Sequence, residues 1–342
     1  MNAVVITSEG SPVASNVKFV EDWVPAIPKS HEVVVKTEAS ALNHLDLWVG
    51  IGMPGLGLEY PRISGSDGCG IVTNIGDGVN KSWIGKRVLL NAAVEQSESV
   101  ITTAYPTQND IRMIGEHDHG TNAEYFAAPV SNVLDVGDAD PVEAVAFGLT
   151  HLTAWRMLVT RANVREGQTV LITGIGGGAA LAAFNICKHF KCNTIVTSRH
   201  QWKLDRALEL GANSAVIDEG EDWSHIVRGL TGKRGVDICV DSVGGPLHHP
   251  CIVSLARGGT LVICGCTAGA TPRTDLARIF WNQLSVLGST MGNMNEFCEV
   301  VSLLKSGMKP VIDSVHESQN AAEAFARLES GEQFGKIVIR WK

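Results

Sequence analysis

The sequence predicts an α/β protein with two parts, a β-rich part followed by a doubly wound parallel sheet. Its 342 residues are about twice the length of a typical domain, which favours two domains. Over roughly the first 125 residues, short apolar runs alternate with Gly, Pro and Asn, as in an antiparallel barrel. From about Val170, apolar runs of strand length alternate with helical segments of about ten residues, which is typical of parallel strands joined by helices.

The β-rich part contains four apolar runs of strand length, at Ala3–Ile6, Glu32–Thr37, Gly70–Ile75 and Arg87–Leu90. In the second part, strands and helices alternate in chain order. The strands are expected at Val170–Ile172, Thr194–Thr197, Ala215–Ile217, Ile238–Val240 and Thr260–Cys264, and the helices at Ala179–His189, Gln201–Leu210 and Trp223–Leu230. The remaining elements are a strand at Ser285–Gly288, a helix near Asn295–Lys305, a helix opened by the near-capping box Asn320–Glu323, and a strand at Ile337–Arg340.

Charge and composition exclude several classes of protein. The net charge is −8 and there is no block of basic residues, so we expect no nucleic-acid or polybasic membrane surface. Met1–Thr7 lacks the positive region of a signal peptide. The uncharged stretch Gln168–Cys187 contains four glycines, so we interpret it as strand, turn and helix rather than a membrane span. The eight cysteines form no Cys-x-x-Cys pair, which indicates buried thiols in a cytoplasmic protein.

A glycine-rich turn carries the first functional signal. Gly174, Gly176, Gly177 and Gly178 lie between an apolar strand and a helix that begins near Ala179. Such a turn lets the backbone approach a pyrophosphate at the N-terminus of the helix, and the small residue that follows permits close packing of helix on strand. The pattern predicts a Rossmann dinucleotide site. A turn that serves only packing, or an S-adenosylmethionine site of the methyltransferase type, remains an alternative.

The end of the next strand indicates which dinucleotide binds. NAD sites usually carry an acid there, whereas this chain has Ser198 and Arg199, with Lys203 four residues on. These side chains suit the 2′-phosphate of NADP(H), although ordinary solvated charges are the alternative. Because ligands bind at the carboxyl ends of parallel strands, backbone contacts to the cofactor are also expected from residues after the fourth and fifth strands. These are Ser242, Val243, Gly265 and Cys266.

Five segments, in this order, give the chain a recognisable family pattern. They are Ser40–Asp46, Gly65–Gly70, Gly115–Tyr125, Leu152–Trp155 and Phe334–Ile337. With them the chain resembles the medium-chain dehydrogenase/reductase superfamily, which holds the zinc alcohol dehydrogenases and the quinone oxidoreductases. The resemblance implies a GroES-like β-barrel over 1–125, completed by 291–342, and a Rossmann domain over 126–290. It also implies a homodimer paired through the strand at Ser285–Gly288.

The departures from the pattern concern the metal. At the three positions that match the catalytic zinc ligands of the alcohol dehydrogenases, this chain has Asn43, Ser66 and Leu149. The segment 91–114, which matches the structural zinc lobe, contains no cysteine or histidine, and His117 and His119 just beyond it resemble turn residues. We therefore predict no metal site. A residual site from His44, Asp46 and Asp67 is the alternative.

A site without zinc favours acceptors that spread incoming negative charge. The resemblance therefore implies hydride transfer from NADPH to a quinone or an α,β-unsaturated carbonyl, on a small hydrophobic substrate. Asn43, Asp46 and Thr153 are the candidate catalytic residues, with Asn43 as a turn cap and Thr153 as the cap of a long helix as alternatives. Lys336 is a candidate phosphate ligand or a surface lysine. The alternative functions are an alcohol dehydrogenase with a non-standard metal site and a catalytically silent NADP-binding structural or sensor protein.

Overall fold

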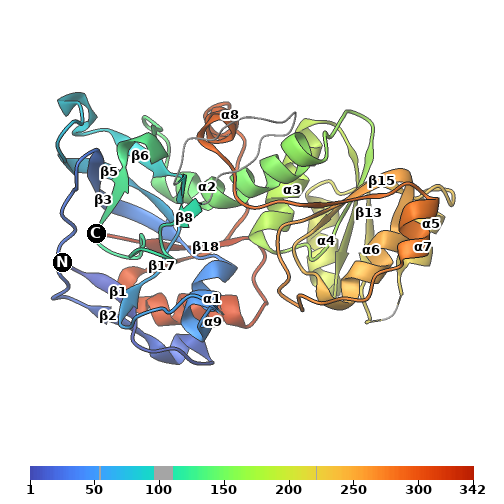
Figure 1. Cartoon of the computed structure of the whole chain (residues 1–342), viewed down its shortest axis with the longest axis horizontal. Coiled ribbons are helices and arrows are strands. Elements are labelled where there is room, and N and C mark those ends of the chain that lie inside the picture. The colour runs from blue at the N-terminus through green and yellow to red at the C-terminus, as the bar shows by residue number, and fades with distance from the viewer. Residues whose placement is uncertain (54, 96–110, 221) are drawn as a thin grey trace. The chain divides into compact units, whose positions relative to one another are not determined.

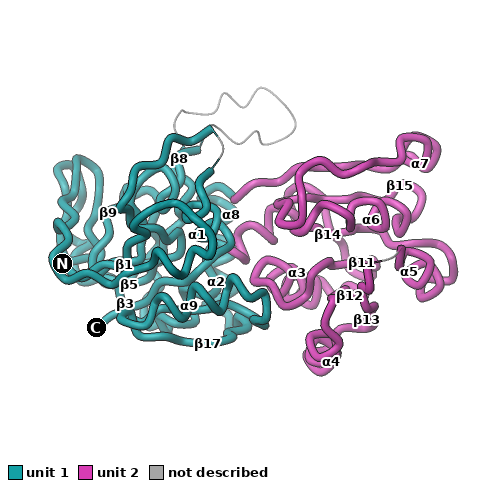
Figure 2. Tube along the Cα trace, turned by 90° about the horizontal axis from the view of Figure 1, so that it is seen from below, with its two compact units in different colours: residues 1–149, 292–342 teal, residues 150–291 magenta. Residues whose placement is uncertain are grey.

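The computed structural model describes every residue except 54, 96–110 and 221, and divides the chain into two compact units. Unit 1 comprises Met1–Leu149 and Gly292–Lys342, and unit 2 comprises Thr150–Met291 (Figure 2). The expected fold class, a GroES-like domain with a Rossmann domain, is confirmed. The expected boundary near residue 125 falls inside unit 1, because the strand β9 (Tyr125–Pro129) pairs with β3 of that unit. The return of the chain to unit 1 at Gly292 lies next to the expected residue 291.

Unit 1 is built on an antiparallel sheet in the order β10-β6-β5-β3-β18-β17, with β9 also beside β3. Only the pair of β17 and β18 at its end is parallel. A three-stranded sheet, β2-β1-β4, and the pair β7–β8 complete the strands among the residues described. Their bounds are β1 Ala3–Ile6, β2 Val17–Val20, β3 Glu32–Ala41, β4 Arg62–Ile63, β5 Asp67–Ile75, β6 Arg87–Leu90, β7 Ala93–Glu95, β8 Ile111–Met113, β10 Val133–Asp135, β17 Ile312–Glu317 and β18 Lys336–Arg340.

Two helices show where local sequence signals are misleading. Helix α1 (His44–Ile51) was not expected, and α2 (Pro141–Trp155) begins at Pro141 rather than near Thr153. The reason is local: the Asp140 carboxylate caps the first turn of α2, accepting from the N–H groups of Val142 and Glu143. The predicted cap role of Thr153 is therefore wrong, since this residue lies in the last turn of α2.

Two C-terminal helices, α8 (Met294–Lys305) and α9 (Ala321–Glu329), match the expected positions. Helix α8 has a capping box, in which Asn293 and Glu296 exchange side-chain bonds, whereas at α9 the Asn320 side chain makes no cap bond. Helices α1 and α9 pack on strands β1 and β18 in one apolar cluster that contains Ile6, Leu47, Phe325 and Ile339.

Unit 2 is a six-stranded parallel sheet in the order β13-β12-β11-β14-β15-β16, with helices packed around it (Figure 1). The strand order reverses between β11 and β14, which is the point where such sheets bind ligands. The strands are β11 Thr169–Ile172, β12 Asn193–Ser198, β13 Ser214–Ile217, β14 Val236–Asp241, β15 Leu255–Ile263 and β16 Ser285–Gly288. The helices are α3 Gly178–His189, α4 Gln201–Glu209, α5 Ser224–Leu230, α6 His248–Ser254 and α7 Leu276–Trp281, and a π-helical turn, Arg156–Arg161, follows α2.

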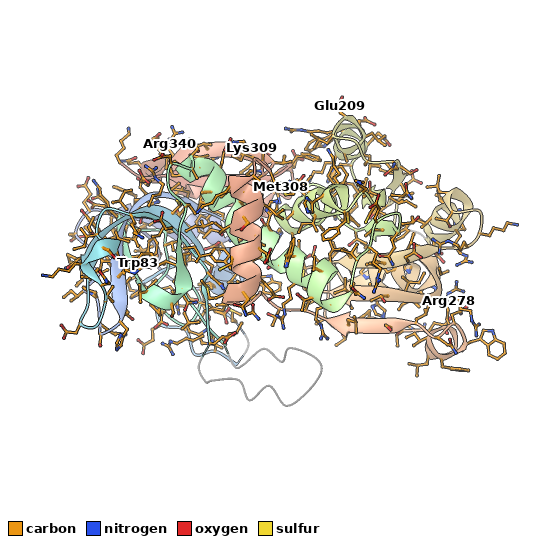
Figure 3. All side chains as sticks on the ribbon, turned by 90° about the horizontal axis from the view of Figure 1, so that it is seen from above. Trp83, Glu209, Arg278, Met308, Lys309 and Arg340 are labelled. Carbon is orange, nitrogen blue, oxygen red and sulfur yellow. The ribbon has the colours of Figure 1, made fainter. Side chains whose placement is uncertain are left out.

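Burial explains why this part was predictable. The expected strands of unit 2 are mainly apolar because both faces of the sheet are covered, and Leu171, Val216, Cys239 and Leu261 lie in one buried cluster. Charged side chains such as Glu209, Lys309 and Arg340 lie at the surface (Figure 3). In the described parts of the chain, no helix is long and apolar enough to cross a membrane.

Candidate active site

The glycine-rich turn has the geometry that the sequence predicts. Gly174 has a φ of +62° and Gly176 a φ of +114°, conformations that residues with a side chain rarely adopt. A Cβ on Gly174 would also lie 2.8 Å from Cγ2 of Val243. Gly177 caps helix α3, so the N–H groups of Gly178 and the two alanines that follow have no acceptor inside the helix. This turn therefore offers free backbone donors where the chain approaches Val243.

The loops after β14 and β15 lie beside this turn. The buried Asp241 carboxylate accepts from the Thr173 hydroxyl at 2.7 Å and from the N–H groups of Val243 and Gly244 at 2.9 and 3.1 Å. The N–H of Ala268 donates to the Val243 carbonyl at 2.8 Å. Asp241 thus ties the turn after β11 to the loop after β14. The predicted residues Ser242, Val243, Gly265 and Cys266 gather at this edge of the sheet, and only Cys266 among them is exposed.

The predicted 2′-phosphate residues lie at the end of β12. Ser198 is the last residue of the strand, and its hydroxyl accepts from the N–H of His200 at 3.1 Å. Arg199 is exposed, whereas Lys203 is only 5% exposed and holds its Nζ 5.3 Å from the centroid of the Trp202 ring. Arg199 is the more accessible cation of the two.

A cavity of about 410 Å³ opens in unit 2 between the loop at Gly245–Pro246 and the segment Ala268–Arg273. None of the predicted cofactor residues lines it, so we do not assign it to the dinucleotide.

Unit 1 contains a compact polar centre at the start of α1. Asn43 is the N-cap residue of this helix, and its N–H donates to Oδ2 of Asp46 at 2.7 Å. The Asn43 side chain is 8% exposed, and its Nδ2 donates to Oδ2 of Asp67 at 2.9 Å. The turn-cap alternative for Asn43 is therefore correct as far as its backbone is concerned, while its amide faces a second carboxylate.

Asp67 and Lys336 form a buried ion pair within this centre. Lys336 Nζ lies 2.9 Å from Oδ2 of Asp67, and the two side chains are 4% and 0% exposed. The ammonium also donates to Oδ1 of Asn43 at 2.6 Å and to the Leu42 carbonyl at 2.8 Å. The other oxygen of Asp67 accepts from the N–H of Leu149 at 2.7 Å. All three ammonium protons are thus donated within unit 1. This arrangement does not support the predicted phosphate contact, and the surface-lysine alternative is wrong.

Burial shifts the pKa of two neighbours of the pair. Desolvation raises the pKa of Asp46 to about 6, against smaller opposing contributions from its bond to the Asn43 N–H, the Ser64 hydroxyl and the Lys336 charge. His44 has a lowered pKa, first from desolvation and second from the charge of Lys336.

Comparison with known proteins agrees with this architecture. The alcohol dehydrogenase GroES-like domain matches residues 29–138, and the zinc-binding dehydrogenase domain matches residues 178–306. A zinc-type alcohol dehydrogenase-like protein of Leptosphaeria maculans is 30% identical over 329 residues, which cover 91% of each chain. The chain belongs to the medium-chain dehydrogenase/reductase superfamily. It is therefore an oxidoreductase of a superfamily whose members bind nicotinamide cofactors.

Two further members of the superfamily align over nearly their whole length. A human quinone oxidoreductase is 25% identical over 350 residues, covering 99% of this chain and 97% of its own. A crystal structure of an NAD-dependent alcohol dehydrogenase is 35% identical with a TM-score of 0.91, and each chain is covered completely. The relatives thus include a protein named for zinc and proteins named quinone oxidoreductase.

The residues of this chain do not fit the zinc that these relatives' names imply. The amide of Asn43 is engaged by Lys336 and Asp67, and the Ser66 hydroxyl donates to the Ile114 carbonyl at 2.7 Å. The third ligand position, Leu149, supplies only its N–H, to Asp67. In the described part of the chain, no three His, Cys, Asp or Glu side chains form a group that could hold a metal ion. The predicted absence of metal stays a prediction, which metal analysis tests.

The remaining candidates divide between the two units. His117 and His119 each accept a backbone N–H, from Met113 and Ile63, in keeping with turn residues. Thr153 is buried and belongs to unit 2. Residues 96–110, most of the altered lobe, lie outside the described residues.

The pairing of Lys336 with Asp67 was not predicted from the sequence. The sequence held one signal of this pairing, because the apolar strand β18 begins with a lysine.

Proposed function

We propose that this protein is an NADPH-dependent reductase of quinones or α,β-unsaturated carbonyls that works without a metal. The observation that carries the proposal is the polar centre of unit 1, where Asn43 stands at a position that matches a zinc ligand and its amide is held by the buried pair of Lys336 and Asp67. The quinone oxidoreductases among the relatives support the same acceptor class.

The donor side of the proposal rests on unit 2. The turn at Gly174–Gly178 and the N–H groups around Ala179 would hold the pyrophosphate, with Ser242, Val243, Gly265 and Cys266 providing further backbone contacts. Ser198 and Arg199 at the end of β12 would bind the 2′-phosphate, because the acid that usually binds a free ribose hydroxyl is missing there. When bound, the dinucleotide supplies a hydride.

The residues of unit 1 would handle the charge that develops on the acceptor. Addition of hydride to the β-carbon of an enone, or to a quinone, leaves negative charge on an oxygen, which hydrogen-bond donors stabilise. The Asn43 amide is the donor of this centre for that task, and Asp46 orients the start of α1 through its bond to the Asn43 N–H. Thr153 remains a candidate contact on the nicotinamide side.

The remaining expectations are also part of the proposal. We expect a small hydrophobic acceptor, a cytoplasmic enzyme, and a homodimer paired through β16. This strand is the last in the sheet order, and Val286 on it is 42% exposed. Sedimentation of the purified protein tests the dimer, and a monomer at micromolar concentration would exclude it.

The test is a substrate panel with both dinucleotides. Purified protein is assayed for loss of NADPH or NADH absorbance with quinones, enones and enals, and for reduction of NADP⁺ or NAD⁺ with alcohols. We expect turnover of conjugated acceptors with NADPH preferred, and a loss of at least about tenfold in kcat/KM in Asn43→Ala with NADPH binding retained. Efficient use of NADH would contradict the assignment of Ser198 and Arg199, and binding of NADPH without turnover of any acceptor would favour the silent cofactor-binding protein.

A further inference from the structure

The strongest unassigned feature of the molecule is the cation inside the polar centre of unit 1. Lys336 Nζ contacts three oxygen atoms at 2.6 to 2.9 Å, from Asn43, Leu42 and Asp67. A lysine that is 4% exposed carries a large desolvation cost, which the Asp67 charge and two further acceptors offset. If Lys336 served only to pack this strand, an apolar side chain could take its place without loss of stability. The charge of Lys336 therefore needs an explanation.

The geometry around Asn43 supplies that explanation. The Asn43 amide lies between two opposite charges: its Oδ1 accepts from the Lys336 ammonium, and its Nδ2 donates to the Asp67 carboxylate. An amide turned over by 180° would place its NH₂ group against the ammonium and its oxygen against the carboxylate. Both contacts would be repulsive, so only one orientation is stable.

This orientation leaves one proton of Nδ2 weakly held. One Nδ2 proton is bonded to Asp67 at 2.9 Å, while among the residues described the other reaches only the Ala41 carbonyl, at 3.5 Å. The ammonium on Oδ1 draws electron density from the amide and strengthens its N–H donors. The pair therefore fixes and polarises the amide at the same time.

We propose that Lys336 is a positioning residue of the reductase, which together with Asp67 locks the Asn43 amide so that an Nδ2 proton is presented to the acceptor oxygen. The Lys336 ammonium thereby places a positive charge next to the Asn43 amide, which donates to the developing anion. The inference rests on the proposed function for its catalytic consequence, while the locked amide is a property of this chain alone.

A set of four proteins separates this role from simple structural support: wild type, Lys336→Met, Asp67→Asn and the double variant. Lys336→Met leaves Asp67 buried without a counter-charge, so its Tm should fall by roughly 10 °C. The double variant removes both charges and keeps an acceptor for the Leu149 N–H, so most of that Tm should return. We expect kcat to stay at least about tenfold lower in the double variant than in Asp67→Asn, with KM for NADPH unchanged in both.

The recovery of kcat relative to Tm distinguishes a positioning role of Lys336 from simple charge balance. If kcat recovers together with Tm in the double variant, Lys336 only balances the charge of Asp67 and the proposal is overturned. Lys336→Arg is the matched control, because it keeps the charge and should retain more activity than Lys336→Met.

A second readout needs no acceptor at all. In ¹⁵N-labelled protein, the Asn43 side-chain amide signals, assigned by their loss in Asn43→Ala, should exchange slowly with solvent in wild type and at least about tenfold faster in the double variant. Equal exchange rates would refute the lock even if the enzyme is active. If wild type reduced no acceptor, the proposed function would fail while slow exchange still supported the lock.

Discussion

Replacing Asp46 by Asn should make the stability of this protein less dependent on pH. Asp46 is 1% exposed, accepts the Asn43 N–H through Oδ2, and has a pKa raised from 3.8 to about 6. The folded protein therefore holds the Asp46 proton more tightly than the unfolded chain does. A group with a raised pKa stabilises the fold fully below its unfolded value, and this contribution is lost as pH rises through about 6.

The size of the effect follows from the shift. About two pKa units at 1.36 kcal/mol each correspond to roughly 3 kcal/mol between pH 4 and pH 8. Asn cannot ionise and keeps an oxygen for the Asn43 N–H, so Asp46→Asn avoids this loss. The variant should be more stable than wild type at pH 8, by up to about 3 kcal/mol less the cost of burying its NH₂ group, and the advantage should vanish near pH 4.

The assay is chemical denaturation of both proteins at intervals from pH 4 to pH 8. Burial and the charge of Lys336 lower the pKa of His44, so the comparison is repeated in a His44→Gln background, where the pH-dependent difference between the protein with Asp46 and its Asp46→Asn variant should persist. A stability difference between Asp46→Asn and wild type that is constant across this range would refute the reasoning, because it would mean that Asp46 ionises normally in the fold.

Four further predictions address the cofactor site and the core. Gly174→Ala should raise the Kd for NADPH at least about tenfold, because a Cβ there meets Val243 and the φ of +62° is strained; isothermal titration measures it, and unchanged affinity would exclude the turn from the site. Arg199→Ala should weaken NADPH binding about tenfold and leave NADH binding unchanged, and an equal loss for both would remove Arg199 from the 2′-phosphate site. Asp241→Ala leaves the Thr173 hydroxyl and two backbone N–H groups without their acceptor and should cost at least about 3 kcal/mol in denaturation, so a loss below about 1 kcal/mol would contradict its tying role. Phe325→Ala, in the core of unit 1, should cost about 3 to 5 kcal/mol, and a smaller loss would indicate that the cluster closes over the cavity.

The elements that the sequence predicted best are those that burial alone dictates. The buried middle of strands such as β11 and β14, at Val170–Ile172 and Ile238–Val240, is apolar because helices cover both faces of the sheet, so these runs stand out in the sequence without any knowledge of tertiary contacts. The glycine-rich turn was equally predictable, since the positive φ of Gly174 and Gly176 restricts the residue type at each position.

The parts that sequence reasoning missed depend on contacts between distant segments. Lys336 and Asp67 are 269 residues apart, and nothing near Lys336 in the sequence indicates a partner that would bury it. The short helix α1 was missed because its start is fixed by a bond between Asn43 and Asp46, whereas Asn43 was interpreted as a catalytic residue or the cap of a turn, and Asp46 as a catalytic residue. The helix α2 was placed too late because the cap at Asp140 was not considered.

The proposal of a reductase without metal is tested most directly by measuring metal content and turnover on the same sample. Protein is purified without added metal, treated with a strong chelator, and analysed for bound metal by mass spectrometry before its assay with NADPH and a quinone or enone. We predict substoichiometric metal and full turnover after chelation. Stoichiometric zinc in the purified protein, with activity that the chelator abolishes and zinc restores, would contradict the account.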